Sequence, residues 1–403
     1  MGVRLGNGNW GVKANKLLAY NDASGMFFNK EFDFTRATAA TRVNKSGLIE
    51  IVDTNIPRID FTDDTKGHLL LEPASTNKIV YSQNFNLTGT PNSGTGRQNN
   101  ATTSPSSLPS PDGGTNAFTF IYDGTFNASI RKIVGVDAGE VITMSIFLKK
   151  TADTPVFSAD TDIRIGMFNN LAANVGLNLG NAINAAPVGE WRRYSLSATG
   201  DSDGGQCVPN VRCDVAASID AFGWQVETNS FATSYIPTSG STVTRNAETC
   251  ESSGAIQDFN PTEGVLYMEV AALKDDLTSR EISISDSSAH NRVSMFFGGT
   301  SDRIRAEVKV GNSTAFNAFT SSFDIENFNK IAIRYKALGY EFYLNGSRFA
   351  TQHSQSLIFS FNKLDSLNFL RKTVGSTNFY GKVREVRAYT RLLTDAELIT
   401  LTT

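Results

Sequence analysis

The sequence predicts an all-β protein, with an N-terminal arm and an adaptor followed by two β-sandwich domains. Two observations predict this class. Thr, Ser, Asn and Gly are plentiful, whereas long helix-forming runs of Ala, Leu, Glu and Lys are absent, and such a composition favours short strands and many turns. Several segments, such as Val141–Lys149, also alternate between apolar and polar residues. This alternation is typical of strands in a sheet.

Composition narrows the class further. A chain of 403 residues has room for two or three domains, and it is 40% apolar and 19% charged, as in soluble globular proteins. Its net charge of −3 argues against a nucleic-acid binder, which needs a basic face. No apolar run approaches the roughly 18 residues that span a membrane, and the N-terminus lacks a signal-peptide core. We therefore expect synthesis in the cytoplasm and no membrane insertion.

Residues 1–33 are predicted to form the arm. They are rich in Gly and Asn, and their apolar residues are too few to form a core alone. Exposed apolar residues grouped in this way usually mark an interface. We expect the arm to become ordered against a neighbouring subunit or a larger assembly, through Trp10, Leu17, Leu18 and Tyr20.

Residues 34–86 are predicted to form a turn-rich adaptor, because Thr, Asn, Asp and Pro punctuate its short apolar segments. Arg36, Arg42 and Arg58 recur close to acidic residues in this stretch. Hydrogen-bonded arginines can fix irregular backbone where a hydrophobic core is thin, so we expect some of them to be paired and partly buried. The neighbouring acids are Asp33, Glu50 and Asp60.

Two sandwich domains are predicted next, at residues 87–248 and 261–403, with a polar linker at 249–260. In the first, Val141–Lys149 places Ile142, Met144, Ile146 and Leu148 on one face. In the second, Asn345-Gly346 separates two apolar segments and is a strong hairpin signal. Thr394 and Glu397 have the spacing of a capping box, which predicts a short C-terminal helix.

Catalytic and metal-binding patterns are scarce. The three histidines have no second ligand at metal-binding spacing, and no activated nucleophile is recognisable, so we expect no enzyme activity. Carboxylates in the Asp201–Asp203 loop and at Asp275–Asp276 could hold a structural calcium or simply lie in solvated turns. The metal site is left open, and no other cofactor is expected. Cys207 and Cys213 could form a disulfide, or all three cysteines could be reduced.

Three parts of the sequence resemble known families. The stretch Phe34 to Asn84 contains FTRATAATRVN, GLIE, NIPRIDF and LLLEPASTN, and it resembles a segment of many tailed-phage structural proteins, which include tail fibre, head fibre and receptor-binding proteins. AGEVITMSIFLKK, GEWRRYSLSATG and AFGWQVETNSFATSYIPTSGSTVTRNAE resemble the carbohydrate-binding-module type of jelly roll found in phage fibres. KIAIRYKALGYEFYLNGSRFAT and FYGKVREVRAYTRLLTDAELITL resemble the concanavalin-like, laminin-G type of sandwich.

The resemblance implies a non-enzymatic phage virion protein, a fibre or spike subunit of the tail or head that adheres to host-surface glycans. It implies attachment to other virion proteins through the N-terminal arm and a homo-oligomer, most simply a trimer. Aromatic rings stack on sugars, and the candidates for exposed rings are Tyr122, Phe126 and Tyr340. A purely structural decoration protein without a ligand is one alternative. A polysaccharide depolymerase is another, although the sequence lacks the repeats typical of such spikes.

Overall fold

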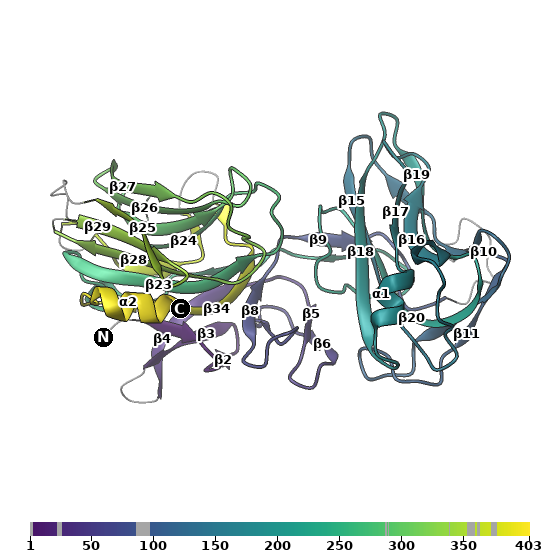
Figure 1. Ribbon diagram of the computed structural model, residues 1–403. Helices are drawn as coiled ribbons and strands as arrows, with labels where there is room; N and C mark the ends of the chain where they lie inside the picture. Colours follow the sequence, from purple (N-terminus) through teal and green to yellow (C-terminus); the bar gives the residue numbers. More distant parts are fainter. Residues whose placement is uncertain are drawn as a thin grey trace. The chain divides into compact units, whose positions relative to one another are not determined.

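The chain folds into two compact units, both built from β-strands (Figure 1). Unit 1 contains residues 1–45, 52–73 and 246–403, and unit 2 contains residues 46–51 and 74–245. Antiparallel sheets dominate both units, which confirms the all-β prediction. The computed structural model describes residues 3–21, 26–85, 97–286, 288, 290–337, 339–352, 359–360, 363–371 and 377–403.

Unit 2 is a sandwich of two sheets. One sheet has the hydrogen-bonded order β10 (Arg97–Asn99), β13 (Ala128–Arg131), β19 (Gly205–Cys213), β16 (Ile163–Phe168) and β17 (Val175–Asn178), with β14 (Val134–Val136) also paired to β19. The other has the order β11 (Ala101–Pro105), β12 (Phe118–Asp123), β20 (Ala216–Glu227), β15 (Val141–Lys149) and β18 (Trp191–Thr199). Two further elements of this unit are the short helix α1 (Gly180–Ala185) and the strand pair β9 (Ser75–Asn77) and β21 (Val243–Arg245).

The core of unit 2 lies between these sheets. Ile142, Met144, Ile146 and Leu148 of β15 are all buried there, as their alternation predicted. Trp224 of β20 is also fully buried in this core, because the inner side chains of both sheets converge on one apolar layer.

Unit 1 is a larger sandwich. Among the described residues its main sheet has the order β22 (Thr249–Glu251), β4 (Met26–Thr35), β3 (Lys16–Asn21), β1 (Arg4–Gly6), β34 (Gly381–Tyr389), β23 (Glu263–Ala272), β28 (Asn329–Lys336), β29 (Gly339–Leu344) and β30 (Ser347–Gln352). Also joined to it are β2 (Gly11–Lys13), β7 (Ile59–Asp60) and β8 (His68–Leu71). The second sheet has the order β27 (Ser313–Phe319), β26 (Ile304–Val310), β25 (Arg292–Phe297), β24 (Arg280–Ser285) and β31 (Ser366–Asn368). The remaining short strands of unit 1 are β5 (Ala40–Val43), β32 (Leu370–Arg371) and β33 (Thr377–Asn378), whereas all but the last residue of β6 (Ile49–Val52) belongs to unit 2.

The prediction of a separate N-terminal arm is wrong. Strand β1 pairs with β34, near the other end of the chain, with Leu5 opposite Val386, and β3 pairs with β4. Val3, Leu5 and Leu17 are buried in the core of unit 1. The few apolar residues of this stretch suffice because a core built mostly by residues 250–388 is already there to receive them.

The expected adaptor and linker are not separate segments either. Within the 34–86 stretch, residues 34–45 and 52–73 belong to unit 1, whereas residues 46–51 and 74–86 belong to unit 2, so the stretch is divided between the two units. The expected linker contributes β22, which pairs with β4 and carries the fully buried Cys250. A three-residue strand without a visible alternation gives too weak a signal to be recognised in a polar sequence.

Two local predictions are confirmed in unit 1. Asn345 and Gly346 both have positive φ values, 45° and 81°, and they connect β29 to β30 in the turn geometry that Asn-Gly favours. Helix α2 (Asp395–Thr402) begins at a capping box, in which the Thr394 hydroxyl accepts from the Glu397 N–H and the Glu397 carboxylate accepts from the Thr394 N–H. Helix α2 lies against β28 and β29 (Figure 1), and Leu398 belongs to a small buried cluster with Val265 and Tyr343.

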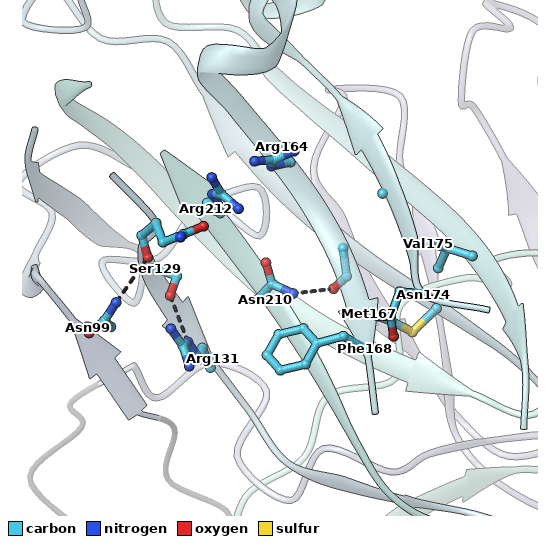
Figure 2. Close-up of a pocket in the computed structure, with 13 residues that line it drawn as sticks. Asn99, Ser129, Arg131, Arg164, Met167, Phe168, Asn174, Val175, Asn210 and Arg212 are labelled. Atoms are coloured by element: carbon cyan, nitrogen blue, oxygen red, sulfur yellow. Dashed lines mark hydrogen bonds between the residues drawn. The ribbon is translucent and has the colours of Figure 1, made fainter. Parts of the chain in front are cut away.

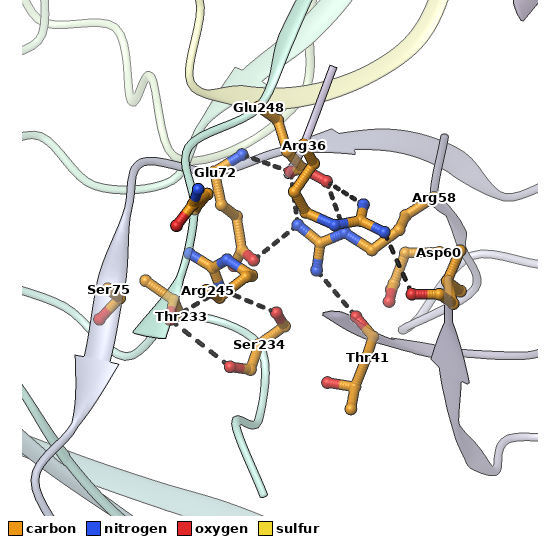
Figure 3. A network of polar contacts seen from close by, with 12 residues as sticks. Arg36, Thr41, Arg58, Asp60, Glu72, Ser75, Thr233, Ser234, Arg245 and Glu248 are labelled. Atoms are coloured by element: carbon orange, nitrogen blue, oxygen red, sulfur yellow. Dashed lines mark hydrogen bonds and ion pairs between the residues drawn. The ribbon is translucent and has the colours of Figure 1, made fainter. Parts of the chain in front are cut away.

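A buried ionic network fixes the turn-rich part of unit 1 (Figure 3). The Glu248 carboxylate accepts from Arg36 Nη1 at 2.8 Å and from Arg58 Nε at 2.8 Å. Arg58 also donates to Glu72 at 2.8 Å and to the Thr41 carbonyl. The expectation of paired, buried arginines is therefore confirmed for Arg36 and Arg58. The partners differ from those expected, since Glu248 lies far along the chain.

All three thiols are free and buried. Cys207 and Cys213 lie on the same strand, β19. Six residues of strand separate their Cα atoms by roughly 20 Å, far beyond the ~7 Å limit for a disulfide. The alternative of a Cys207–Cys213 bridge is thus excluded within this fold.

Candidate functional site

The three aromatic rings predicted to contact a glycan differ in their exposure to solvent. Tyr122 is 2% exposed in the core of unit 2, where its hydroxyl donates to the Val211 carbonyl. Tyr340 is 2% exposed in the core of unit 1 and stacks on Phe316. The prediction of exposed contacts is therefore wrong for both, because each ring is on the inner face of its strand. Phe126 is 70% exposed, and the Arg212 guanidinium carbon lies 4.6 Å from its ring centroid.

A hollow of about 510 Å³ lies close to this ring, on unit 2 (Figure 2). Residues of β10, β13, β16, β17 and β19 line it, and most of their side chains are polar. Its lining residues are Asn99, Asn127, Ser129, Arg131, Arg164, Gly166, Met167, Phe168, Asn174, Val175, Gly176, Asn210 and Arg212. A space of this size is within the range of small-ligand sites.

Strand alternation explains why these polar side chains share one face. On β13, β16 and β19, successive side chains point to opposite faces. Ile130, Ile165 and Val211 point into the core, so Ser129, Arg131, Arg164, Asn210 and Arg212 point outward. Register then places them in rows, because Arg212 is opposite both Ser129 and Arg164. In the next row Asn210 is opposite Arg131 and Gly166.

Two paired glycines form part of the floor. Gly166 of β16 is opposite Gly176 of the edge strand β17. A Cβ at Gly166 would lie 3.0 Å from the Val175 carbonyl oxygen, whereas a Cβ at Gly176 would meet only the Ile165 carbonyl oxygen, at 3.8 Å. The Asn210 amide lies over Gly166, whereas position 176 has space for a side chain.

The Asp214 carboxylate organises one side of the hollow. It accepts from Arg212 Nε at 2.7 Å and Nη2 at 2.8 Å, from Arg164 Nη2 at 3.3 Å, and from the Asn127 N–H at 2.9 Å. Partial burial raises the pKa of Asp214, but the hydrogen bonds from Arg212 and Asn127 and the guanidinium charges outweigh it and hold the pKa below its usual range. Across the hollow, Arg131 Nε donates to the Ser129 hydroxyl at 2.7 Å.

The predicted interface residues near the N-terminus contact their own unit. Leu17 is fully buried, and Trp10 packs against the core while its Nε1 donates to the Lys66 carbonyl at 2.9 Å. Leu18 is half-buried. The side chain of Tyr20 lies outside the described part of the structure. Burial therefore rules out Leu17 as part of an interface with another chain.

The two loops considered for calcium hold their carboxylates by other bonds. Asp201 accepts from the N–H groups of Asp203 and Gly204, and Asp276 pairs with Arg280 at 2.7 Å. In the described part of the chain, no group of three or more His, Cys, Asp or Glu side chains is placed to hold a metal ion. A calcium in these loops stays a prediction, to be tested by titration.

His68 is a buried titratable group in unit 1. Its Nε2 is 3.8 Å from Asp60 and its Nδ1 is 3.7 Å from Asp64, with Lys382 and Arg384 also close enough to interact. Burial lowers the pKa of His68 to about 4, although the two carboxylates oppose the shift. His68 is therefore neutral at pH 7.

Asp214 lies beside the hollow and is paired with Arg164 and Arg212. None of the described lining residues of the hollow is Asp or Glu, whereas glycoside hydrolysis generally needs two carboxyl groups facing the scissile bond. Elsewhere, the described helices are too short and too polar to cross a bilayer.

The arginines of the hollow were not singled out in the sequence. Each is on the polar side of an alternating strand, which resembles an ordinary solvated face. The available signal was weak: Arg164, Gly166 and Phe168 alternate with apolar residues in IRIGMF. Nothing local shows that this strand pairs with the one that contains Arg212.

Part of the chain matches a family model. Residues 270–399 match the concanavalin A-like lectin/glucanase superfamily, so unit 1 contains a concanavalin-like domain of the laminin-G type. A search of the curated proteins found no match.

Several solved structures show a distant likeness. The CBM40 module of the Ruminococcus gnavus IT-sialidase, bound to α2,3-sialyllactose, is 14% identical with a TM-score of 0.31, over 38% of this chain and 94% of that one. Mouse laminin α1 domains LG4-5 are 10% identical with a TM-score of 0.24, over 68% and 92%. A putative carbohydrate-binding protein from Bacteroides ovatus is 11% identical with a TM-score of 0.23, over 68% and 79%.

Proposed function

We propose that the chain is a non-catalytic, glycan-binding β-sandwich protein and that the hollow of unit 2 is its binding site. The observation that carries this proposal is the composition of the hollow. Guanidinium and amide groups offer hydrogen bonds for sugar hydroxyls, and Phe168 and the nearby Phe126 offer rings for the apolar face of a sugar. Hydrogen-bonding groups beside an aromatic surface suit a sugar, which has both hydroxyl groups and an apolar face.

The described lining residues of the hollow include no pair of carboxyl groups, which supports binding without hydrolysis. The concanavalin-like match in unit 1 is to a superfamily described by lectins and glucanases, and it supports a saccharide-related role for the chain as a whole. A depolymerase would require a facing pair of carboxyl groups, so reducing ends released from a polysaccharide by the purified chain would refute the binding-only proposal.

Glycan binding can be tested on an oligosaccharide array with the full chain and two variants. Gly176→Leu fills the floor of the hollow from an exposed edge strand, where a Cβ meets no close neighbour. We expect it to abolish retention of every bound glycan while the protein stays folded. Arg192→Gln is the control, because Arg192 is 41% exposed on β18 of the other sheet, and it should bind as the parent does. Equal retention by all three proteins would remove the hollow from the proposal.

We also propose that the chain is a phage fibre, spike or decoration subunit, active in the virion as a homotrimer. The resemblance of residues 34–84 to tailed-phage structural proteins supports this role. Attachment would involve an outer surface of unit 1 rather than a free arm, since β1 and β3 are sheet strands. Immunogold labelling of particles from a phage that encodes the chain tests the location, and light scattering tests the trimer. Unlabelled particles or a stable monomer would refute the respective claim.

A decoration protein without a ligand is the second candidate. Its distinguishing result is particle labelling together with no retained glycan on the array.

A further inference from the structure

We propose that the hollow of unit 2 selects saccharides that carry an oxyanion, above all a carboxylate, over neutral saccharides. This inference rests on the proposed function and specifies its ligand class. The observation behind it is an excess of positive charge in the hollow. Three arginines line it, and one carboxylate, Asp214, pairs with two of them.

The arrangement of these charges is unusual for a sheet surface. Arg164 and Arg212 lie directly opposite each other on β16 and β19, and like charges in that position repel. Asp214 joins the two guanidinium groups at 3.3 Å and 2.7 Å. Arg131 is in the next row, opposite Asn210, and adds a third positive charge, while none of the described lining residues is Asp or Glu. The chain as a whole has a net charge of −3, so the hollow is positive in an acidic protein.

Hydrogen-bond donors are left over for a ligand. A guanidinium has five N–H groups. Arg164 commits only Nη2 to Asp214, and Arg212 commits Nε and Nη2. The side chains of both are only partly exposed, 30% and 20%, so their orientation is fixed by packing and by Asp214. Guanidinium groups bind carboxylates and phosphates through pairs of N–H groups.

The rest of the hollow fits a sugar that carries such a group. The floor is open at Gly176, and Phe168 provides an apolar wall (Figure 2). Asn99 and Asn210 offer their side-chain carbonyl oxygens as acceptors for hydroxyl groups, while the Nδ2 group of each donates to a backbone carbonyl. A bare inorganic anion would use only the guanidinium groups, whereas an acidic sugar would use the whole surface. We therefore assign the hollow to an acidic saccharide rather than to a free anion.

Asp214 has a positioning role here. Besides both arginines it holds the N–H of Asn127, which follows the exposed Phe126. The same carboxylate thus ties the cationic groups to the loop that presents the ring.

The test is calorimetric titration of the full chain with matched ligand pairs. One pair is a glucuronate-containing oligosaccharide and its carboxyl-reduced, neutral form, and the second is a sugar phosphate and its parent sugar. Acetate and inorganic phosphate are titrated alone. We expect the glucuronate form to bind about tenfold more tightly than the neutral form, and this difference to shrink at high salt. A larger gain for the phosphate pair than for the glucuronate pair would overturn carboxylate as the preferred oxyanion.

Variants separate this inference from the proposed function. Arg164→Gln removes one charge at a partly exposed position and should reduce the preference to less than about threefold. Gly176→Leu should abolish binding of acidic and neutral forms alike, and Arg192→Gln should change neither. Equal affinity for the two forms, together with loss of both in Gly176→Leu, would refute acidic selectivity and leave glycan binding intact. Unchanged binding in Gly176→Leu would refute the site itself. Acetate or phosphate binding as tightly as the acidic sugar would also overturn the inference.

Discussion

Replacing Glu248 with Gln removes the central anion of the buried network in unit 1. Each carboxylate oxygen of Glu248 accepts two hydrogen bonds: Oε1 from Arg36 and Arg58, and Oε2 from Arg58 and the Glu72 N–H. The side chains of Arg36, Arg58 and Glu248 are completely inaccessible to solvent. An amide offers one accepting oxygen and no charge, so one guanidinium charge would be left without a buried counter-charge.

Breaking a buried ion pair by removing one partner costs about 3–5 kcal/mol. A domain of this size loses roughly 2–4 °C of melting temperature per kcal/mol, so we expect the transition of unit 1 to fall by about 10 °C. Differential scanning calorimetry of the full chain measures the shift. The control is Glu326→Gln, which removes an exposed carboxylate paired with Lys274 and should cost no more than about 1 kcal/mol. Equal shifts for the two variants would refute the stabilising role of the network.

Three further predictions concern buried groups. The pKa of His68 is lowered to about 4 in the folded protein, so below about pH 6.5 the unfolded chain binds a proton that the folded chain does not. The parent should therefore lose up to about 3 kcal/mol of its free energy of unfolding between about pH 6.5 and 4. His68→Gln should lose less over the same range. Urea titrations across that range check this, and parallel pH profiles would contradict it. Leu5→Ala should destabilise unit 1 by about 2–5 kcal/mol, because Leu5 is fully buried in its core; an unchanged urea midpoint would mean that the N-terminal strands are not part of the fold. Native protein should resist alkylation at Cys207, Cys213 and Cys250. Burial raises the pKa of each thiol, to about 12 for Cys207 and about 11 for Cys213. Mass spectrometry should find alkyl groups on all three only after denaturation, and rapid labelling of the native protein would contradict this.

Elements with a local cause could be predicted from the sequence. The strand Val141–Lys149 follows from its alternation, the hairpin from Asn345-Gly346, and the start of α2 from Thr394 and Glu397. In each case the residues that determine the element are within a few positions of one another. Their outcome depends little on what the rest of the chain does.

Elements with a distant cause could not be predicted. Strand β1 has only three residues, and it is a strand because β34, at the other end of the chain, offers an edge. Glu248 became the partner of Arg36 across 212 positions of sequence. Such pairings depend on topology, which composition and spacing do not specify.

The candidate site shows the same limit. Tyr122 and Phe126 are close in sequence and equally suited to bind a sugar, yet one is in the core and the other is exposed. Tyr122 is buried because it is on the inner face of β12, whereas Phe126 is exposed in the loop that follows this strand. Arg131, Arg164 and Arg212 come from three strands, and register alone makes them one surface.

A crystal structure of the full chain with the most tightly retained oligosaccharide tests the central claim most directly. We predict that the saccharide occupies the hollow of unit 2, with its acidic group against Arg164 and Arg212 and a ring face toward Phe168. A saccharide bound on unit 1, with the hollow of unit 2 left empty at saturating ligand, would contradict the account.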